Sequence, residues 1–91
     1  MQIHFIKNIQ FTKLVKAEGR LREFNFRKYS GNTGEFLFSV DVVDDRGNRI
    51  IFRMQKEDSA WKIVPGQLPA WIFSKDDSFH ELIEEELKIA S

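Results

Sequence analysis

The sequence predicts an α+β fold in which a curved antiparallel β-meander of five to six strands packs against one C-terminal α-helix. Apolar and polar residues alternate through most of residues 1–64, with the period of half-buried strands. Clusters of Gly, Asn, Asp and Ser interrupt this alternation where hairpin turns are needed. Apolar residues recur at helical spacing near the end of the chain. We therefore expect one domain over 1–91, with the sheet in 1–64, a loop with a short helical turn in 65–73 and the helix in 74–90.

The first strand signal runs through residues 1–17, where most odd-numbered residues are apolar and most even-numbered residues are polar. On a helix, at about 100° per residue, the same apolar residues would spread around the whole circumference. The stretch exceeds the usual length of one strand, so we expect a bend near Lys7 and Asn8. Glu18-Gly19 then provides a tight turn, because Gly adopts positive φ readily.

The remaining strands follow in sequence, each bounded by turn residues. We predict strands over Arg20–Tyr29, Glu35–Val43 and Arg49–Lys56, and a short last strand around Trp61 and Ile63. The turns between them are Ser30–Gly34, Asp44–Asn48 and Glu57–Ala60. In the second of these turns, we expect Gly47 in the left-handed position that follows a type I turn.

The C-terminal helix has a start signal and an apolar face. Pro69 suits the first position of a short helical turn, and the main helix should begin between Ser74 and Ser78. Ser78-Phe79-His80-Glu81 fits the capping box, in which Ser78 is the N-cap and Glu81 reciprocates. The apolar stripe of the helix consists of Phe79, Leu82, Ile83, Leu87 and Ala90.

The expected core is rich in aromatic residues, because nine Phe and two Trp can each bury a large area. The inward parity of the strands and the stripe of the helix define its members. The predicted core residues are Phe24, Phe26, Phe36, Phe38, Val40, Val42, Ile50, Phe52, Met54, Trp61, Leu82, Ile83 and Leu87.

The opposite face of the predicted sheet is mixed, which is unusual for a sheet with one solvated side. Leu37, Val43 and Ile51 fall on this face beside Ser39, Asp41, Arg53 and Gln55. Three interpretations stay open: the sheet curls partway into a barrel, the face is simply exposed, or it meets a protein partner. Under the last interpretation, the candidate interface residues are Leu37, Val43, Ile51 and Arg53.

Basic residues concentrate near the start of the chain, since residues 1–30 carry seven Lys or Arg and two Glu. Six of these cations lie on the first predicted hairpin, and they could follow the phosphate backbone of a single-stranded nucleic acid. These candidates are Lys13, Lys16, Arg20, Arg22, Arg27 and Lys28. Their mixed parity weakens this interpretation, and the alternative is a solvated hairpin whose charges protect an edge strand.

The residue types required for most catalysis and metal binding are missing or scattered. With no Cys, the chain has no thiol nucleophile and no Cys-based zinc site. His4 and His80 are isolated, and the Glu residues of the last helix lack metal-ligand spacing. No nucleotide-binding or hydrolase motif occurs. We therefore expect no enzyme activity, no cofactor and no metal.

Two further patterns bear on location. A domain this small without Cys is typical of a reducing compartment. The first residues lack the pattern of a signal peptide, and apolar runs such as Ala70–Phe73 are far shorter than the roughly 20 residues of a membrane span. We therefore expect a cytoplasmic protein that does not bind membranes.

The order of elements, a meander followed by a C-terminal helix, is similar to that of the PC4-like single-stranded-DNA-binding domains. This resemblance rests on element order and assigns no role to any residue. It implies that single-stranded nucleic acid belongs among the candidate ligands.

Three functional hypotheses follow, in order of preference. The first is a non-catalytic interaction module that binds a protein partner or forms a homodimer through the outer sheet face. The second is a single-stranded nucleic-acid-binding domain that uses the basic hairpin. The third is a small-molecule site, which would require a pocket beside Trp61 or Trp71; large aromatics at these positions are otherwise expected in the core.

Overall fold

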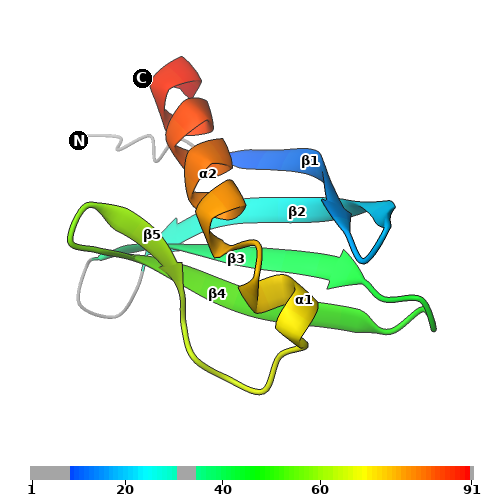
Figure 1. The fold of residues 1–91 in the computed structure, drawn as a ribbon. Coiled ribbons are helices and arrows are strands. Elements are labelled where there is room, and N and C mark those ends of the chain that lie inside the picture. The colour runs from blue at the N-terminus through cyan, green and yellow to red at the C-terminus, as the bar shows by residue number, and fades with distance from the viewer. Residues whose placement is uncertain (1–8, 31–34, 91) are drawn as a thin grey trace, which may run out of the picture.

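The computed structural model describes residues 9–30 and 35–90, and it confirms the predicted α+β meander (Figure 1). One antiparallel sheet has its strands in sequence order. They are β1 (Gln10–Ala17), β2 (Arg20–Ser30), β3 (Phe36–Val43), β4 (Arg49–Glu57) and β5 (Ala60–Ile63). The helices α1 (Ala70–Phe73) and α2 (Asp76–Ala90) follow. The bend predicted near Lys7 and most of the turn predicted over 30–34 lie outside the described residues.

Three tight turns set the register of the sheet. Glu18 and Gly19 both have positive φ, at 52° and 76°, as a two-residue hairpin of the primed type requires. Gly47 has φ 84° and donates its N–H to the Asp44 carbonyl, as expected for a type I turn followed by a left-handed residue. The β4–β5 turn uses Asp58 and Ser59 at φ 48° and 71°, a conformation that favours glycine at the second position.

The core lies between the inner face of the sheet and α2, which crosses it (Figure 1). Phe79 of α2 is fully buried, and its ring centroid lies 4.9 Å from that of Phe24 and 5.7 Å from that of Phe52. Ile83, one turn later, is also fully buried. These two side chains anchor the helix on the sheet, as their helical spacing requires.

Most predicted core residues are buried, and Phe36 is the clear exception. Its side chain is 52% exposed, because it begins β3 at one end of the sheet. Ile50, Leu82 and Leu87 are partly buried at the margin of the core. Fully buried residues that the predicted list omits are Ile72 and Phe79.

Helix α2 begins at Asp76, so the prediction that Ser78 is its N-cap is wrong. The Phe79 N–H donates to the Lys75 carbonyl at 3.0 Å, which places Ser78 inside the first turn. The earlier start has a tertiary cause. Asp76 accepts a hydrogen bond from the Ile63 N–H of β5 at 3.2 Å, so its side chain is used in docking the first turn.

The outer edge of β5 is closed by the same helix. His80 accepts a hydrogen bond through Nδ1 from the Trp61 N–H at 2.9 Å, and the Asp76 carboxylate accepts one from the N–H of Ile63, two residues further along β5. These two N–H groups alternate along the strand with those that pair with β4. Two side chains of α2 thus satisfy donors that would otherwise be open to pairing with another chain.

The β1–β2 and β3–β4 hairpins are joined at their tips by Asp45. Its carboxylate accepts hydrogen bonds from Arg20 at 2.8 Å and from Arg22 at 3.0 and 3.2 Å. Arg22 also donates to the Ala17 carbonyl, and its guanidinium lies 4.6 Å from the centroid of the Trp71 ring. Hydrogen bonding to Arg22 holds the pKa of Asp45 below its ordinary value.

Replacing Ser59 with glycine should stabilise the protein by about 0.5–1 kcal/mol, because left-handed backbone costs an L-residue more than it costs glycine. Urea unfolding of S59G would measure this gain. Ser74, with φ −66°, is the matched control. S74G should be neutral or destabilising, and equal gains from both variants would contradict the role assigned to the left-handed turn.

Stability should fall as the pH falls below about 3.8, the ordinary pKa of an aspartate. The folded-state pKa of Asp45 is lowered, so its contribution is complete above the unfolded pKa and disappears as the pH passes through the folded value. Urea unfolding between pH 2 and 5 should show a shallower pH dependence for D45N than for the parent chain. Parallel curves would refute this assignment.

Candidate functional site

The outer face of the sheet is the surface opposite to α2, and it carries all four candidate interface residues. Val43 and Ile51 are 51% and 62% exposed, Arg53 is exposed and Leu37 is half-buried. Successive side chains of a strand point to opposite faces, so the neighbours of inward residues such as Val42 and Phe52 lie on the outer face. The mixed composition of this face is therefore present on the folded surface.

Four aliphatic side chains form an apolar zone at the end of this face nearest the two hairpin tips. Each is more than half exposed, and they come from four consecutive strands: Leu14, Leu21, Val43 and Ile51. Leu14 pairs with Glu23 and Leu21 pairs with Lys16, so the two leucines are diagonal neighbours. Leu21 and Val43 line one shallow hollow together with Glu23. The zone thus combines exposed aliphatic area with charges of both signs.

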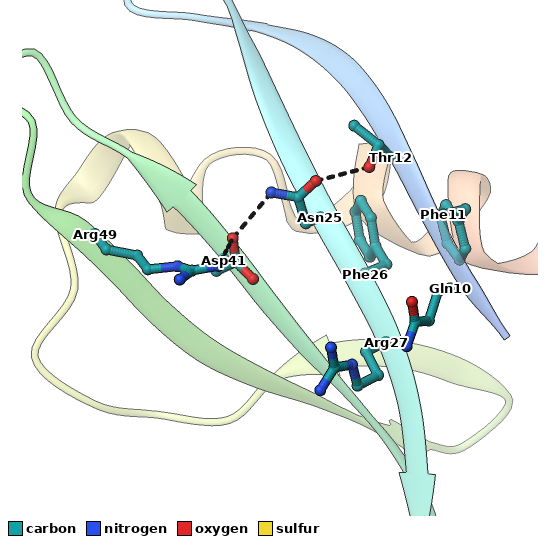
Figure 2. A pocket seen from close by; sticks show the side chains of 8 residues that line it. All are labelled: Gln10, Phe11, Thr12, Asn25, Phe26, Arg27, Asp41 and Arg49. Atoms are coloured by element: carbon teal, nitrogen blue, oxygen red, sulfur yellow. Dashed lines mark hydrogen bonds and ion pairs between the residues drawn. The ribbon is translucent and has the colours of Figure 1, made fainter. Parts of the chain in front are cut away.

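A polar network borders the apolar zone and crosses four strands (Figure 2). Thr12 donates to Asn25 at 2.7 Å, Asn25 donates to Asp41 at 3.0 Å, and Arg49 donates to Asp41 at 3.3 Å. The carboxylate of Asp41 is therefore already engaged by two donors. These residues line a hollow of about 530 Å³ on the outer face, together with Gln10 and Arg27.

Beyond the network lies a row of three residues that we call the arginine row: Arg27, Ser39 and Arg53. Ser39 pairs with Arg27 on one side and Arg53 on the other, so the two arginines flank it on β2 and β4. Both arginines are exposed, and neither forms an ion pair with a residue in 9–30 or 35–90. The next row along the strands includes Tyr29 and Lys62.

The register divides the six cations of the basic hairpin between different surfaces. Lys16 and Arg27 lie on the outer face, whereas Lys13, Arg22 and Lys28 share the parity of the inner core residues. The inner cations have structural partners. Lys13 pairs with Glu86 at 3.1 Å, and the Lys28 ammonium lies 4.2 Å from the centroid of the Phe36 ring.

Arg22 is the most buried of these cations, with its side chain 4% exposed, and Arg20 contacts Asp45 at the hairpin tip. The six therefore do not form one patch. A cationic site instead arises between β2 and β4, from Arg27 and Arg53, which are 26 residues apart in the sequence. The alternation of each strand was visible in the sequence, but the register that places Arg27 and Arg53 on either side of Ser39 was not.

The described residues contain neither a cluster of metal ligands nor a membrane-spanning helix. Over 9–30 and 35–90, no group of three or more His, Cys, Asp or Glu side chains is placed to hold a metal ion. Neither helix in this part of the chain has the length and apolar character needed to cross a bilayer. His80, the described histidine, is used as a hydrogen-bond acceptor for β5.

The geometry of this face thus offers an apolar zone and an arginine row, which adjoin through Ile51 and Arg53 on β4, and a polar network whose Asp41 pairs with Ile51. Comparison of the chain with protein-family models, with curated proteins and with solved structures finds no match.

Proposed function

We propose that this chain is a non-catalytic binding module and that the outer face of its sheet is the binding surface. The observation that supports this most strongly is the apolar zone, with four aliphatic side chains more than half exposed on four consecutive strands. Apolar patches surrounded by polar residues are typical of interaction sites. The inner face instead carries the buried core, on which Phe79 and Ile83 of α2 pack.

A second copy of the chain is the occupant that the apolar zone suits best. In a two-fold interface each residue meets its counterpart's neighbours, so a self-complementary surface needs both signs of charge. The zone has this property, since Glu23 pairs with Leu14, Lys16 pairs with Leu21, and Arg49 pairs with Val43. If the two-fold axis lies parallel to the sheet and perpendicular to its strands, the two outer faces meet at their apolar zones. The two arginine rows then lie at opposite ends of the dimer and do not repel each other. We expect a weak dimer, because four aliphatic side chains bury less than a standard interface.

Replacing Ile51 with lysine should weaken the dimer by roughly tenfold or more, since burying one large aliphatic side chain contributes about 1.5–3 kcal/mol. Sedimentation velocity over a range of concentrations would measure the dissociation constant. The matched control is I89K, because Ile89 is 71% exposed on α2 and lies outside the sheet face. A parent chain that stays monomeric at millimolar concentration, or equal effects of both variants, would refute the proposed interface.

Single-stranded nucleic acid is the second candidate ligand, and the arginine row favours it. Two guanidinium groups without carboxylate partners among the described residues can bind successive phosphates. Tyr29 lies next to Arg27 on the same face of β2, and its half-buried ring can stack on a base. Lys62 adds a third cation in the neighbouring row. This candidate moves the binding residues from the hairpin to the centre of the outer face.

Replacing both Arg27 and Arg53 with glutamine should weaken oligothymidylate binding and lower the slope of log K against log salt by about 1.4, since each single-strand phosphate contact contributes about 0.7. Fluorescence anisotropy at several salt concentrations would measure both. The matched control replaces Lys13 and Lys28, which removes the same charge from the inner face. A larger loss in the control, or no binding by the parent chain at low salt, would contradict this candidate.

A further inference from the structure

The two edges of the sheet differ in how their outward backbone groups are used. At the β5 edge, Asp76 and His80 of α2 accept the N–H groups that point away from β4. The other edge is β1, and the strand order places no described strand on its outer side (Figure 1). No backbone hydrogen bond within residues 9–30 and 35–90 reaches this outer side. An open strand edge of this kind can pair with a further strand.

The register of the β1–β2 hairpin identifies the backbone groups at this edge. Lys28 donates its N–H to the Ile9 carbonyl at 2.9 Å, and the register places these two residues opposite each other. Hydrogen-bonded pairs recur at every second residue of an antiparallel ladder, so the odd-numbered residues of β1 bond to β2. The N–H and C=O groups of the even-numbered residues therefore point outward: Gln10, Thr12, Leu14 and Lys16.

The β1 strand lacks the features that commonly keep edge strands from pairing. It contains no proline, and its one-to-one register with β2 over all eight residues leaves no bulge. A charge on the inner side of the sheet is another such feature, and Lys13 has that parity. Its ammonium group, however, forms an ion pair with Glu86 at 3.1 Å, so its charge is balanced within the chain.

Apolar side chains of β1 remain partly uncovered on both faces of the sheet. Leu14 is 64% exposed on the outer face. Phe11 and Val15 are only partly buried, and they pack at the margin of the core on the inner face. A strand that adds to this edge and carries apolar residues on both of its faces would cover all three with a gain in hydrophobic free energy.

The β1 strand of a second copy has this character, and its charges favour one register. Because the outward groups belong to even-numbered residues, the two-fold axis of an antiparallel pair of β1 strands passes through a residue position. Lys13 and Leu14 are the two positions at the middle of the strand. An axis at Lys13 would place two ammonium groups directly opposite each other, which is destabilising. An axis at Leu14 instead brings the two Leu14 side chains together and places Lys13 opposite Val15 of the second copy.

We propose that two copies of this chain pair edge to edge through β1, in antiparallel orientation and centred on Leu14, so that their sheets become continuous. Leu14 bonds to its counterpart, and Thr12 of each copy bonds to Lys16 of the other. These three pairs supply about six backbone hydrogen bonds, since each pair exchanges two. The contact leaves the outer face accessible and joins the apolar zones of the two copies at Leu14. It does not require the face-to-face contact proposed above, so each contact can be tested without the other.

An NMR experiment on the full chain tests this arrangement directly. In a concentrated mixture of carbon-13-labelled and unlabelled copies, an isotope-filtered nuclear Overhauser spectrum reports only contacts between copies. The Hα protons of Lys13 and Val15 should show such a contact, because opposed residues of a non-hydrogen-bonded pair have Cα atoms about 4.5 Å apart. The contact should persist in I51K, in which the face-to-face contact is weakened. Absence of the Lys13–Val15 contact, or a Phe11–Val15 contact indicating an axis at Lys13, would overturn the proposal.

Proline at position 16 provides a second test. The Lys16 N–H points away from β2, so K16P keeps the ladder of the chain's own hairpin. In the I51K background, K16P should remove the NMR contact and weaken self-association at least tenfold by sedimentation velocity, because the dimer loses two hydrogen bonds. Q10P is the matched control, since Gln10 also has an outward N–H but lies outside the paired segment 11–17. K16Q removes the charge alone, and both controls should associate as I51K does. Equal losses in K16P and either control would contradict the edge contact.

Discussion

The docking of α2 along β5 is the contact on which the rest of this structure depends. Asp76 and His80 accept the two N–H groups of β5 that face away from β4, while Phe79, between them, inserts into the aromatic core. The same helical turn therefore closes the β5 edge of the sheet and packs an aromatic ring on its inner face. Because the helix occupies this face, the outer face is left as the large accessible surface of the sheet.

This division of the sheet explains why cations of one hairpin have different roles. Three cations have the inner parity and a partner there. Lys13 forms an ion pair with Glu86, Arg22 forms one with Asp45, and the Lys28 ammonium lies over the Phe36 ring. Arg27 has no such partner among the described residues, because the helix does not reach the outer face. Whether a charged residue of a strand has a structural partner thus depends on the face of the sheet on which its side chain lies.

The fold class and the strand positions could be predicted from the sequence because alternation and turn residues are local signals. Gly47 is an example, since the geometry of its turn follows from the residues immediately around it. Ser78 shows where local signals fail: its capping-box pattern is satisfactory, but Asp76 starts the helix earlier because its carboxylate bonds to β5. Phe36 has the correct parity for burial, yet the helix does not cover the end of the sheet where it lies.

The order of the elements, the inward parity of each strand and the amphipathic face of the helix are all readable in the sequence, because they depend on neighbours within one turn or one strand. Which distant residues meet depends on the three-dimensional fold. It placed Ser39 between Arg27 and Arg53, and it gathered four aliphatic side chains at one end of the outer face. Register and helix placement are long-range properties, since they minimise the free energy of the whole core rather than that of any one segment.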